Sequence, residues 1–448
     1  MSGPSAIGRF LKVSLRKGRR SAKRGAKNGF FHIIGGNVLV KFISAFSVLL
    51  FPRIMGGDYG TFKLAENLLG YLLIFNGCGA ANAVMRYCAA FDSPAEQNSY
   101  FRFSVRFGLA ANVGLIAVFC GILYIPGLFG VRMVNYGAGG ILASMLAVTF
   151  FDFLFAAAQN FLRTNRENKE YGKNAFMFSA LYALVPLFLA FLFGFFSRSM
   201  EGAVIGRYLA YAAALLLVWR AVRRLPSFRE KPLKFSRGEK TEVAKYAVIS
   251  LAANAFSYVM PYNESIILSV MVTKALYSDF QVAQLLPQSI QYLSTAVIVY
   301  IFPAFAKNYL DGRWIFKNTK KVLLAMSVLM GVITLLGILF APQIVPLFGA
   351  RFKTDSAVRL MRLMFLTFGL NSAVRMPVSN ILAAIGEVRY NVANAIFSST
   401  VHLAVCYAFI RGFGINGAAF GLLIGYVVSS AAAVVYLKYY CNKLGNAH

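Results

Sequence analysis

Charged and chemically reactive side chains are scarce in this chain. Only 14% of its 448 residues are charged, against roughly 25% in an average soluble domain. This scarcity argues against a soluble enzyme and against a DNA-binding protein. The 3 histidines and 5 cysteines show no paired metal-ligand spacing, so we expect no metal, cofactor or disulfide framework. His402 alone lies in the middle of an apolar stretch, where a packing role and a proton-carrying role are both open.

Long apolar stretches dominate what remains. A helix needs about 20 mainly apolar residues to cross a membrane, and 58% of the chain is hydrophobic. The sequence predicts an all-α integral membrane protein with twelve transmembrane helices. The predicted spans are 30–51, 64–90, 107–128, 139–161, 174–197, 202–221, 246–272, 280–306, 322–348, 358–385, 390–410 and 415–440.

The net charge of +30 is explained by topology and indicates no nucleic-acid partner. Lys and Arg concentrate in the cytoplasmic loops of membrane proteins. With both termini cytoplasmic, 33 of the 46 basic residues lie on the inner side and nine on the outer side. Residues 1–29 form a basic arm with apolar side chains at helical spacing. We interpret it as a topological signal or as a segment that binds anionic membrane lipids.

An internal repeat divides the chain. Three segments match later ones in the same order, at separations of 215 to 220 residues: 57–69 with 275–287, 160–179 with 380–399, and 201–211 with 416–426. Such repeats are common in transporters. They predict two pseudo-symmetric six-helix lobes around a central cavity. The expected domains are the arm 1–29, an N-lobe 30–221, a basic cytoplasmic linker 222–245, a C-lobe 246–440 and a cytoplasmic tail 441–448.

Ionisable residues within the spans are the main candidates for function, because charge at membrane depth is costly. Lys41, Arg207, Arg362 and Arg375 are candidates for binding an anionic substrate group. Snorkelling or an internal salt bridge is the alternative for each. Glu264 and Asp152 are candidates for carrying a coupling proton or sodium ion, and a plain ion pair is again the alternative.

Amide side chains form a second pattern. Gln281, Gln284, Gln288 and Gln291 follow helical spacing on one stripe, and Asn254 shares a helical face with Glu264. Amides offer hydrogen-bond donors and acceptors without charge. We predict that Asn254, Gln284, Gln288 and Gln291 contact sugar hydroxyls, while hydrogen bonding between helices is the competing interpretation.

Three stretches resemble a known family. They are FPRIMGGDYGTFKLAENLLGYLLIFNGCGAANAVMRYCA, YSDFQVAQLLPQSIQYLSTAVIVYIFPAFAK, and GEVRYNVANAIF followed by GFGINGAAFGLLIGY. They resemble the bacterial polysaccharide (O-antigen and exopolysaccharide) flippases of the multidrug/oligosaccharidyl-lipid/polysaccharide exporter superfamily. The resemblance extends over about residues 30–440.

The resemblance implies a transporter of the bacterial cytoplasmic membrane, without enzymatic activity. Its substrate would be an undecaprenyl-pyrophosphate-linked oligosaccharide, moved to the outer leaflet by alternating access and often coupled to an ion gradient. Glycan polymerase machinery would be a partner. Lumenal Arg and Lys hold the anionic headgroup in that family, a role that Lys41, Arg207, Arg362 and Arg375 would fill here.

Two alternatives differ in function. One is a cation-coupled multidrug or metabolite antiporter of the same superfamily, although multidrug members carry an acid on the first helix, where this chain has Lys41. The other is a membrane glycan polymerase or acyltransferase. The predicted outer loops are short and contain no His/Asp cluster, which disfavours the enzyme. Lipid II flippases of the superfamily have helices beyond the twelve expected here.

Overall fold

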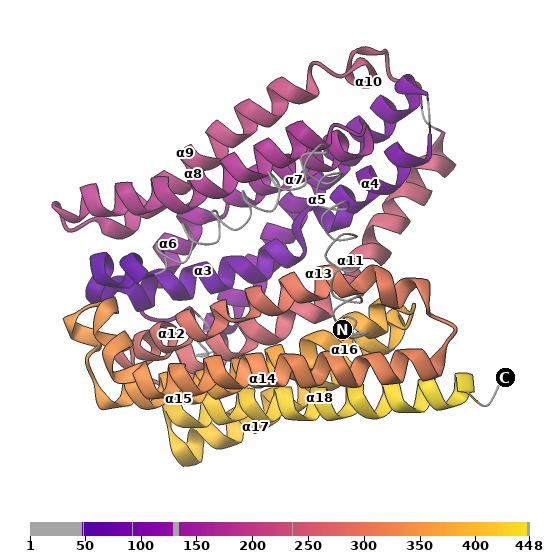
Figure 1. Cartoon of the computed structure of the whole chain (residues 1–448). Helices are drawn as coiled ribbons and strands as arrows, with labels where there is room; N and C mark the ends of the chain where they lie inside the picture. The colour runs from indigo at the N-terminus through magenta and orange to yellow at the C-terminus, as the bar shows by residue number, and fades with distance from the viewer. Residues whose placement is uncertain (1–46, 48, 92, 129–133, 235, 446–448) are drawn as a thin grey trace, which may run out of the picture.

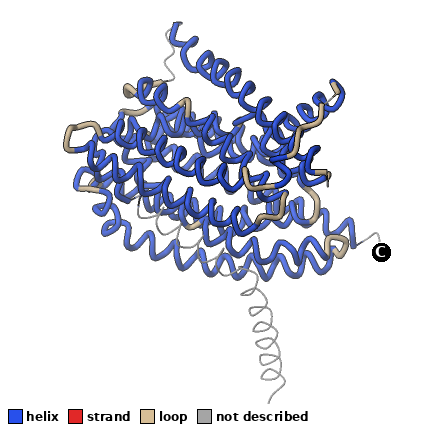
Figure 2. Tube along the Cα trace, turned by 90° about the horizontal axis from the view of Figure 1, so that it is seen from above, coloured by secondary structure: helices blue, strands red, loops and turns tan. Residues whose placement is uncertain are grey.

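The structure is a computed structural model that describes residue 47 and residues 49–91, 93–128, 134–234 and 236–445. Regular structure in these residues is helical (Figure 2). The first half comprises η1 (Gly56–Asp58), α3 (Tyr59–Ile74), η2 (Asn76–Gly79), α4 (Ala80–Ala90), α5 (Pro94–Leu128), α6 (Ala138–Met145), α7 (Val148–Thr164), α8 (Asn168–Gly194) and α9 (Ser199–Val222).

The short helix α10 (Pro226–Arg229) and the long helix α11 (Arg237–Met271) follow. The second half comprises α12 (Lys274–Ser289), α13 (Gln291–Lys307), α14 (Gly312–Ile344), η3 (Val345–Phe348), η4 (Ala350–Phe352), α15 (Asp355–Leu370), the π-helical turn η5 (Asn371–Arg375), α16 (Met376–Ala384), α17 (Val388–Phe413) and α18 (Ile415–Gly445).

Nine helical segments in the described residues are long and apolar enough to span a membrane, so the chain is a multi-pass membrane protein. Helix α11 and the pair α12–α13 are not among the nine. The first predicted span, 30–51, lies mostly outside the described residues. The number of twelve spans therefore stays a prediction.

The two halves lie side by side and converge at one end (Figure 1). There α3 of the first half contacts α12 of the second, and α11 contacts both α3 and α17. We call this the closed end, defined by residues 56–67 and 265–281. At the opposite end, α10 lies far from the C-terminus of α18 (Figure 1). We call that the linker end.

Several predicted spans are interrupted. The span 64–90 is broken at η2, where Gly77, Cys78 and Gly79 all have positive φ values of 61°, 46° and 77°. Glycine adopts this left-handed conformation without a steric penalty, so the break follows from the sequence NGCG. The span 280–306 is two helices, separated at Ile290 shortly after Pro287. The span 358–385 contains η5 immediately before Pro377.

Helix α11 begins nine residues earlier than the span predicted at 246–272, inside the stretch predicted as linker. Ser236 caps it by accepting a hydrogen bond from the Glu239 backbone N–H at 3.2 Å, and the Glu239 carboxylate accepts one from the Ser236 backbone N–H at 2.7 Å. This capping box satisfies helix donors that lack a partner in the first turn. The backbone N–H and the hydroxyl of Ser236 both donate to the Glu239 carboxylate, and these hydrogen bonds lower the pKa of Glu239.

Two turns have the same backbone hydrogen bonds at a separation of 220 residues. The N–H of Glu167 donates to Leu162 O at 3.0 Å, and the N–H of Glu387 donates to Leu382 O at 2.8 Å. One residue before, Arg166 and Gly386 both have positive φ. These turns join α7 to α8 and α16 to α17, within two segments that the internal repeat pairs, and the structure therefore agrees with the repeat here.

The helices that follow pack through equivalent glycines. A Cβ at Gly206 of α9 would lie 2.4 Å from Pro186 Cα in α8, and one at Gly421 of α18 would lie 2.8 Å from Cys406 Cα in α17. Both contacts involve backbone atoms, which cannot rotate away. The pair α8–α9 is therefore built like the pair α17–α18.

We predict that Gly206→Ala destabilises the protein by about 1–3 kcal/mol, because the added methyl overpacks the α8–α9 contact. Thermal unfolding of the purified protein in detergent measures the effect. Gly114→Ala in α5 is the matched control, since its Cβ would meet no atom within 4 Å. It should be neutral or stabilising by up to about 1 kcal/mol. Equal melting temperatures for the two variants would contradict the packing argument.

Candidate functional site

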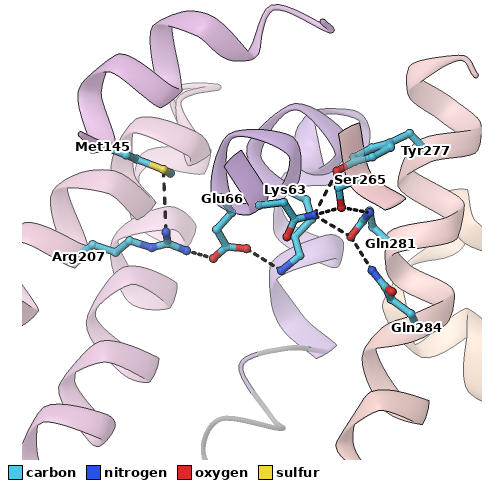
Figure 3. Close-up of polar contacts among 9 residues, drawn as sticks. Lys63, Glu66, Met145, Arg207, Ser265, Tyr277, Gln281 and Gln284 are labelled. Atoms are coloured by element: carbon cyan, nitrogen blue, oxygen red, sulfur yellow. Dashed lines mark hydrogen bonds and ion pairs between the residues drawn. The ribbon is translucent and has the colours of Figure 1, made fainter. Parts of the chain in front are cut away.

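The amide of Asn67 joins the two halves at the closed end, where it meets Ser265, Tyr277 and Gln281 (the latter three labelled in Figure 3). From α3, its Nδ2 lies 2.7 Å from Ser265 Oγ in α11 and 3.2 Å from both Tyr277 Oη and Gln281 Oε1 in α12. Gln284 Nε2 donates to the same Gln281 oxygen at 2.7 Å. We call these five residues the Asn67 cluster. All of these residues except Gln284 are buried. Separating the halves here therefore breaks hydrogen bonds between buried polar groups.

Close packing and peripheral contacts surround the Asn67 cluster. A Cβ at Gly60 would lie 2.2 Å from Ser278 Oγ, so α3 and α12 approach as closely as their backbones allow. Lys274 Nζ pairs with Asp58 Oδ1 at 3.0 Å across the same boundary. Tyr136 Oη donates to Val272 O at 2.5 Å. The halves are thus held together at the closed end by buried and exposed polar contacts.

A second polar group surrounds Asp152 of α7, at the break between α3 and α4. Its carboxylate accepts hydrogen bonds from Asn76 Nδ2 and Tyr211 Oη, both at 2.7 Å. Asn112 Nδ2 donates to Asn76 Oδ1 at 2.7 Å, and the Gly77 N–H donates to Asn112 Oδ1 at 2.6 Å. No Lys or Arg in the described residues forms an ion pair with Asp152. Its partners are all neutral.

Glu264 of α11 is 2% exposed, and its Oε1 has no hydrogen-bond partner among the described residues. Tyr277 and Tyr426 lie near it. An uncompensated buried carboxylate is costly in its charged form. Glu264 is therefore suited to exist as a neutral acid or to take up a cation.

Arg207 of α9 is 3% exposed and forms an ion pair with Glu66 (Figure 3). The other Glu66 oxygen accepts from Lys63 Nζ at 2.8 Å. The Arg207 guanidinium lies over the Phe62 ring at 5.0 Å from its centroid. This arrangement matches the internal salt bridge that was the alternative to substrate binding.

The other predicted cations have different surroundings. Lys41 lies outside the described residues. Arg362 is exposed and donates to Ile338 O at 3.2 Å. Arg375 is half-buried at the end of the π-helical turn η5, a kind of bulge often found at functional sites. Its Nε donates to Ser429 Oγ at 2.9 Å, and its guanidinium lies 5.3 Å from the Tyr426 ring centroid. No described carboxylate pairs with Arg375.

The internal repeat relates these two polar sites. It pairs Tyr211 with Tyr426. Tyr211 hydrogen-bonds the carboxylate of Asp152, whereas Tyr426 lies against the guanidinium of Arg375. Corresponding tyrosines therefore contact a negative group in the first half and a positive group in the second.

The predicted amide stripe divides into two parts. Gln281 and Gln284 belong to the Asn67 cluster, which matches the alternative of hydrogen bonding between helices. Gln288 is exposed and Gln291 is half-buried. The Asn254 side chain lies outside the described residues. The sequence reasoning missed Asn67 and Ser265, although a lone asparagine in the apolar run LAENLLGYLLIF was the available signal.

The described residues contain no group of three or more His, Cys, Asp or Glu side chains that could hold a metal ion. The sequence matches no protein-family model, and it matches no curated protein.

Solved structures of low sequence identity share the fold. A multidrug resistance MATE family transporter of the MOP superfamily in an inward-facing conformation is 16% identical, with a TM-score of 0.72 over 91% of this chain and 95% of that one. The lipid II flippase MurJ in an inward closed conformation is 15% identical, with a TM-score of 0.69 over 92% and 90%. The Vibrio cholerae MATE transporter VcmN in its bent form is 14% identical, with a TM-score of 0.53 over 92% and 98%. The chain shares the fold of these proteins.

We predict that Glu66→Gln destabilises the protein by about 3–5 kcal/mol, because it leaves Arg207 buried without its carboxylate. Chemical or thermal unfolding in detergent measures the loss. Glu201→Gln, which removes an exposed acid from the same helix α9 as Arg207, should change stability by less than about 0.5 kcal/mol. If Glu66→Gln unfolds like the unsubstituted protein, Arg207 does not depend on this ion pair.

Proposed function

We propose that this protein is a flippase for undecaprenyl-pyrophosphate-linked oligosaccharide in the bacterial cytoplasmic membrane. Arg375 carries the proposal. It is a half-buried guanidinium within a membrane span, held by neutral Ser429 and Asn371. Its charge is left for an anionic group to neutralise, and pyrophosphate is such a group. The fold shared with the lipid II flippase MurJ supports a lipid-linked substrate.

The substrate would contact several regions of the molecule. The pyrophosphate docks on Arg375, together with Lys41 as the sequence predicts. The glycan contacts Gln288 and Gln291, which the Asn67 cluster leaves free. The lipid tail stays in the bilayer, and the substrate moves from the inner to the outer leaflet.

Alternating access then requires the closed end to open. Two structures described as inward-facing and inward closed match this chain with TM-scores of 0.72 and 0.69. The bent form of VcmN matches it with a TM-score of 0.53. With the termini cytoplasmic, the closed end faces outward and the linker end faces the cytoplasm. Substrate entering from the cytoplasm leaves only after Asn67 separates from Ser265, Tyr277 and Gln281.

Asp152 and Glu264 would couple this movement to an ion gradient. Both are acids without a described basic partner, so each can bind and release a proton or a sodium ion. The same observation favours a second candidate function, a cation-coupled multidrug antiporter, which the MATE neighbours also support. The two functions differ in their dependence on Arg375.

Deletion of the gene should abolish surface glycan and trap lipid-linked repeat units on the cytoplasmic leaflet. Complementation with Arg375→Ala should restore less than about a tenth of the export, because one charge-assisted contact to the pyrophosphate is worth about 1.5–3 kcal/mol. Surface glycan is measured by labelling intact cells at matched protein levels.

Arg359→Ala is the matched control, because Arg359 of α15 is exposed and is not among the predicted substrate-binding residues, so this variant should export normally. Normal glycan export in the Arg375→Ala strain would contradict the headgroup assignment. If deletion instead left surface glycan intact and raised sensitivity to cationic drugs, the antiporter would be the function.

Weakening the Asn67 cluster should shift the protein toward the outward-facing state. A disulfide between Asp58→Cys and Lys274→Cys reports closure, since these residues form a salt bridge across the closed end. Asn67→Ala removes hydrogen bonds worth about 1 kcal/mol each, so cross-linking should fall several-fold under a mild oxidant. Asn318→Ala, whose amide bonds only its own helix at Trp314 O, should leave cross-linking unchanged. Unchanged cross-linking in the Asn67→Ala protein would show that other contacts hold the closed end.

A further inference from the structure

An apolar groove lies between the first described helical turns and α8. It has a volume of about 830 Å³, and its lining includes Leu50, Arg53, Leu184, Phe188, Phe191 and Phe195. Both of its walls belong to candidate membrane spans, Leu49–Ala90 and Lys169–Gly194. Three phenylalanines of the groove are more than half exposed. The surroundings of the groove are therefore the lipid bilayer.

The two walls run in the same direction along the groove. Ser47 Oγ donates to Ala183 O at 3.1 Å, so these two residues lie at the same depth, at the end of the groove nearer the middle of the span. A Cβ at Gly194 would lie 4.0 Å from Ile54 Cγ2, so these two residues lie at the same depth, at the end of the groove near the closed end. Leu50 and Leu184 thus lie toward the middle of the span, while Arg53 lies at the closed end of the groove.

Among the residues that the structure describes, Arg53 is the one charged residue that lines the groove. Its side chain is exposed, and no described acid forms a salt bridge with it. Its backbone adjoins the second half, since a Cβ at Gly349 would lie 3.6 Å from Arg53 Cα. The groove therefore joins an apolar channel in the bilayer to an uncompensated positive charge at the boundary of the halves.

This combination determines the chemistry of the occupant. A lipid chain can fill a groove whose apolar walls offer no hydrogen bonds to water. An anionic headgroup neutralises an arginine near the membrane interface. A neutral lipid would leave the charge of Arg53 uncompensated. A second copy of the chain on this face would bring its own Arg53 to the contact and add repulsion between like charges.

We infer that the groove between residues 50–54 and α8 is a binding site for an anionic membrane lipid. Its chain lies along Leu184, Phe188 and Phe191, and its headgroup binds Arg53. The site does not depend on which substrate the protein carries, because it faces the bilayer and uses none of the residues assigned to transport.

Quenching of tryptophan fluorescence by brominated lipid chains tests the site. The reporter is Phe188→Trp, an aromatic replacement at a residue that is 63% exposed. It is made in a protein whose two native tryptophans carry Trp219→Phe and Trp314→Phe. The matched control is Phe397→Trp, at a residue of α17 that is 55% exposed and lies outside the groove. Each protein is reconstituted in vesicles with increasing brominated phosphatidylglycerol or brominated phosphatidylcholine.

At the Phe188→Trp reporter, half-maximal quenching should need about fivefold less phosphatidylglycerol than phosphatidylcholine. This is the affinity ratio expected from the attraction of one basic residue to an anionic lipid near the membrane surface. At the Phe397→Trp control the two lipids should quench equally. Adding Arg53→Gln should remove the preference, whereas Arg359→Gln, an exposed arginine outside the groove, should keep it.

Equal quenching by both lipids at the Phe188→Trp reporter would overturn the inference, as would a preference that survives Arg53→Gln. Quenching by neither lipid, in a protein that runs as a dimer, would also overturn it and assign the groove to a second copy. Native mass spectrometry of the protein with its native tryptophans gives an independent reading. It should retain phosphatidylglycerol, and Arg53→Gln should retain several-fold less.

Discussion

The amide of Asn67 donates to three oxygens that belong to α11 and α12, and the closed end depends on this contact. In an apolar span, an unpaired amide group costs free energy that no surrounding water recovers. The halves must therefore stay together at this end or exchange these hydrogen bonds for others, with water or substrate. A polar contact of this kind is strong enough to define a conformation and weak enough to be reversed, unlike an all-apolar seam of the same area.

The charged groups at membrane depth fall into two classes by their partners. Arg207 and Lys63 share the carboxylate of Glu66 inside the first half, and the Arg207–Glu66 ion pair holds α3 against α9. Asp152, Glu264 and Arg375 have neutral partners in the described residues, or no partner for one oxygen. Under the proposed function, the members of this second class are the described groups whose charge or protonation a transported ion or substrate would change. Burial alone does not separate the classes, because both contain nearly fully buried members.

Much of the fold could be predicted from the sequence, because apolar length and basic loops are properties of single segments. The turns at residues 162–167 and 382–387 have matching hydrogen bonds at the separation that the repeat predicts. The interruptions within the predicted spans were harder to predict, although the glycines of NGCG and the prolines at 287 and 377 mark them. The candidate site could be predicted only in part, since the spacing of Gln281 and Gln284 identifies a shared helical face but not what lies opposite. Asn67, on a different helix, supplies that missing partner.

Gly60 and Ser278 are partners in the internal repeat and also touch each other. Two matched residues can be neighbours only where the axis relating their segments passes between them, as in a symmetric dimer, where residues near the twofold axis meet their own copies. If the chain arose by duplication of a gene for a self-associating half, this position once contacted the same position of the partner. Any side chain there then occurred twice in the interface. After fusion the two copies could diverge, and the chain now has glycine at one position and serine at the other. Under that origin, the crossing of α3 and α12 corresponds to the centre of the former homodimer interface.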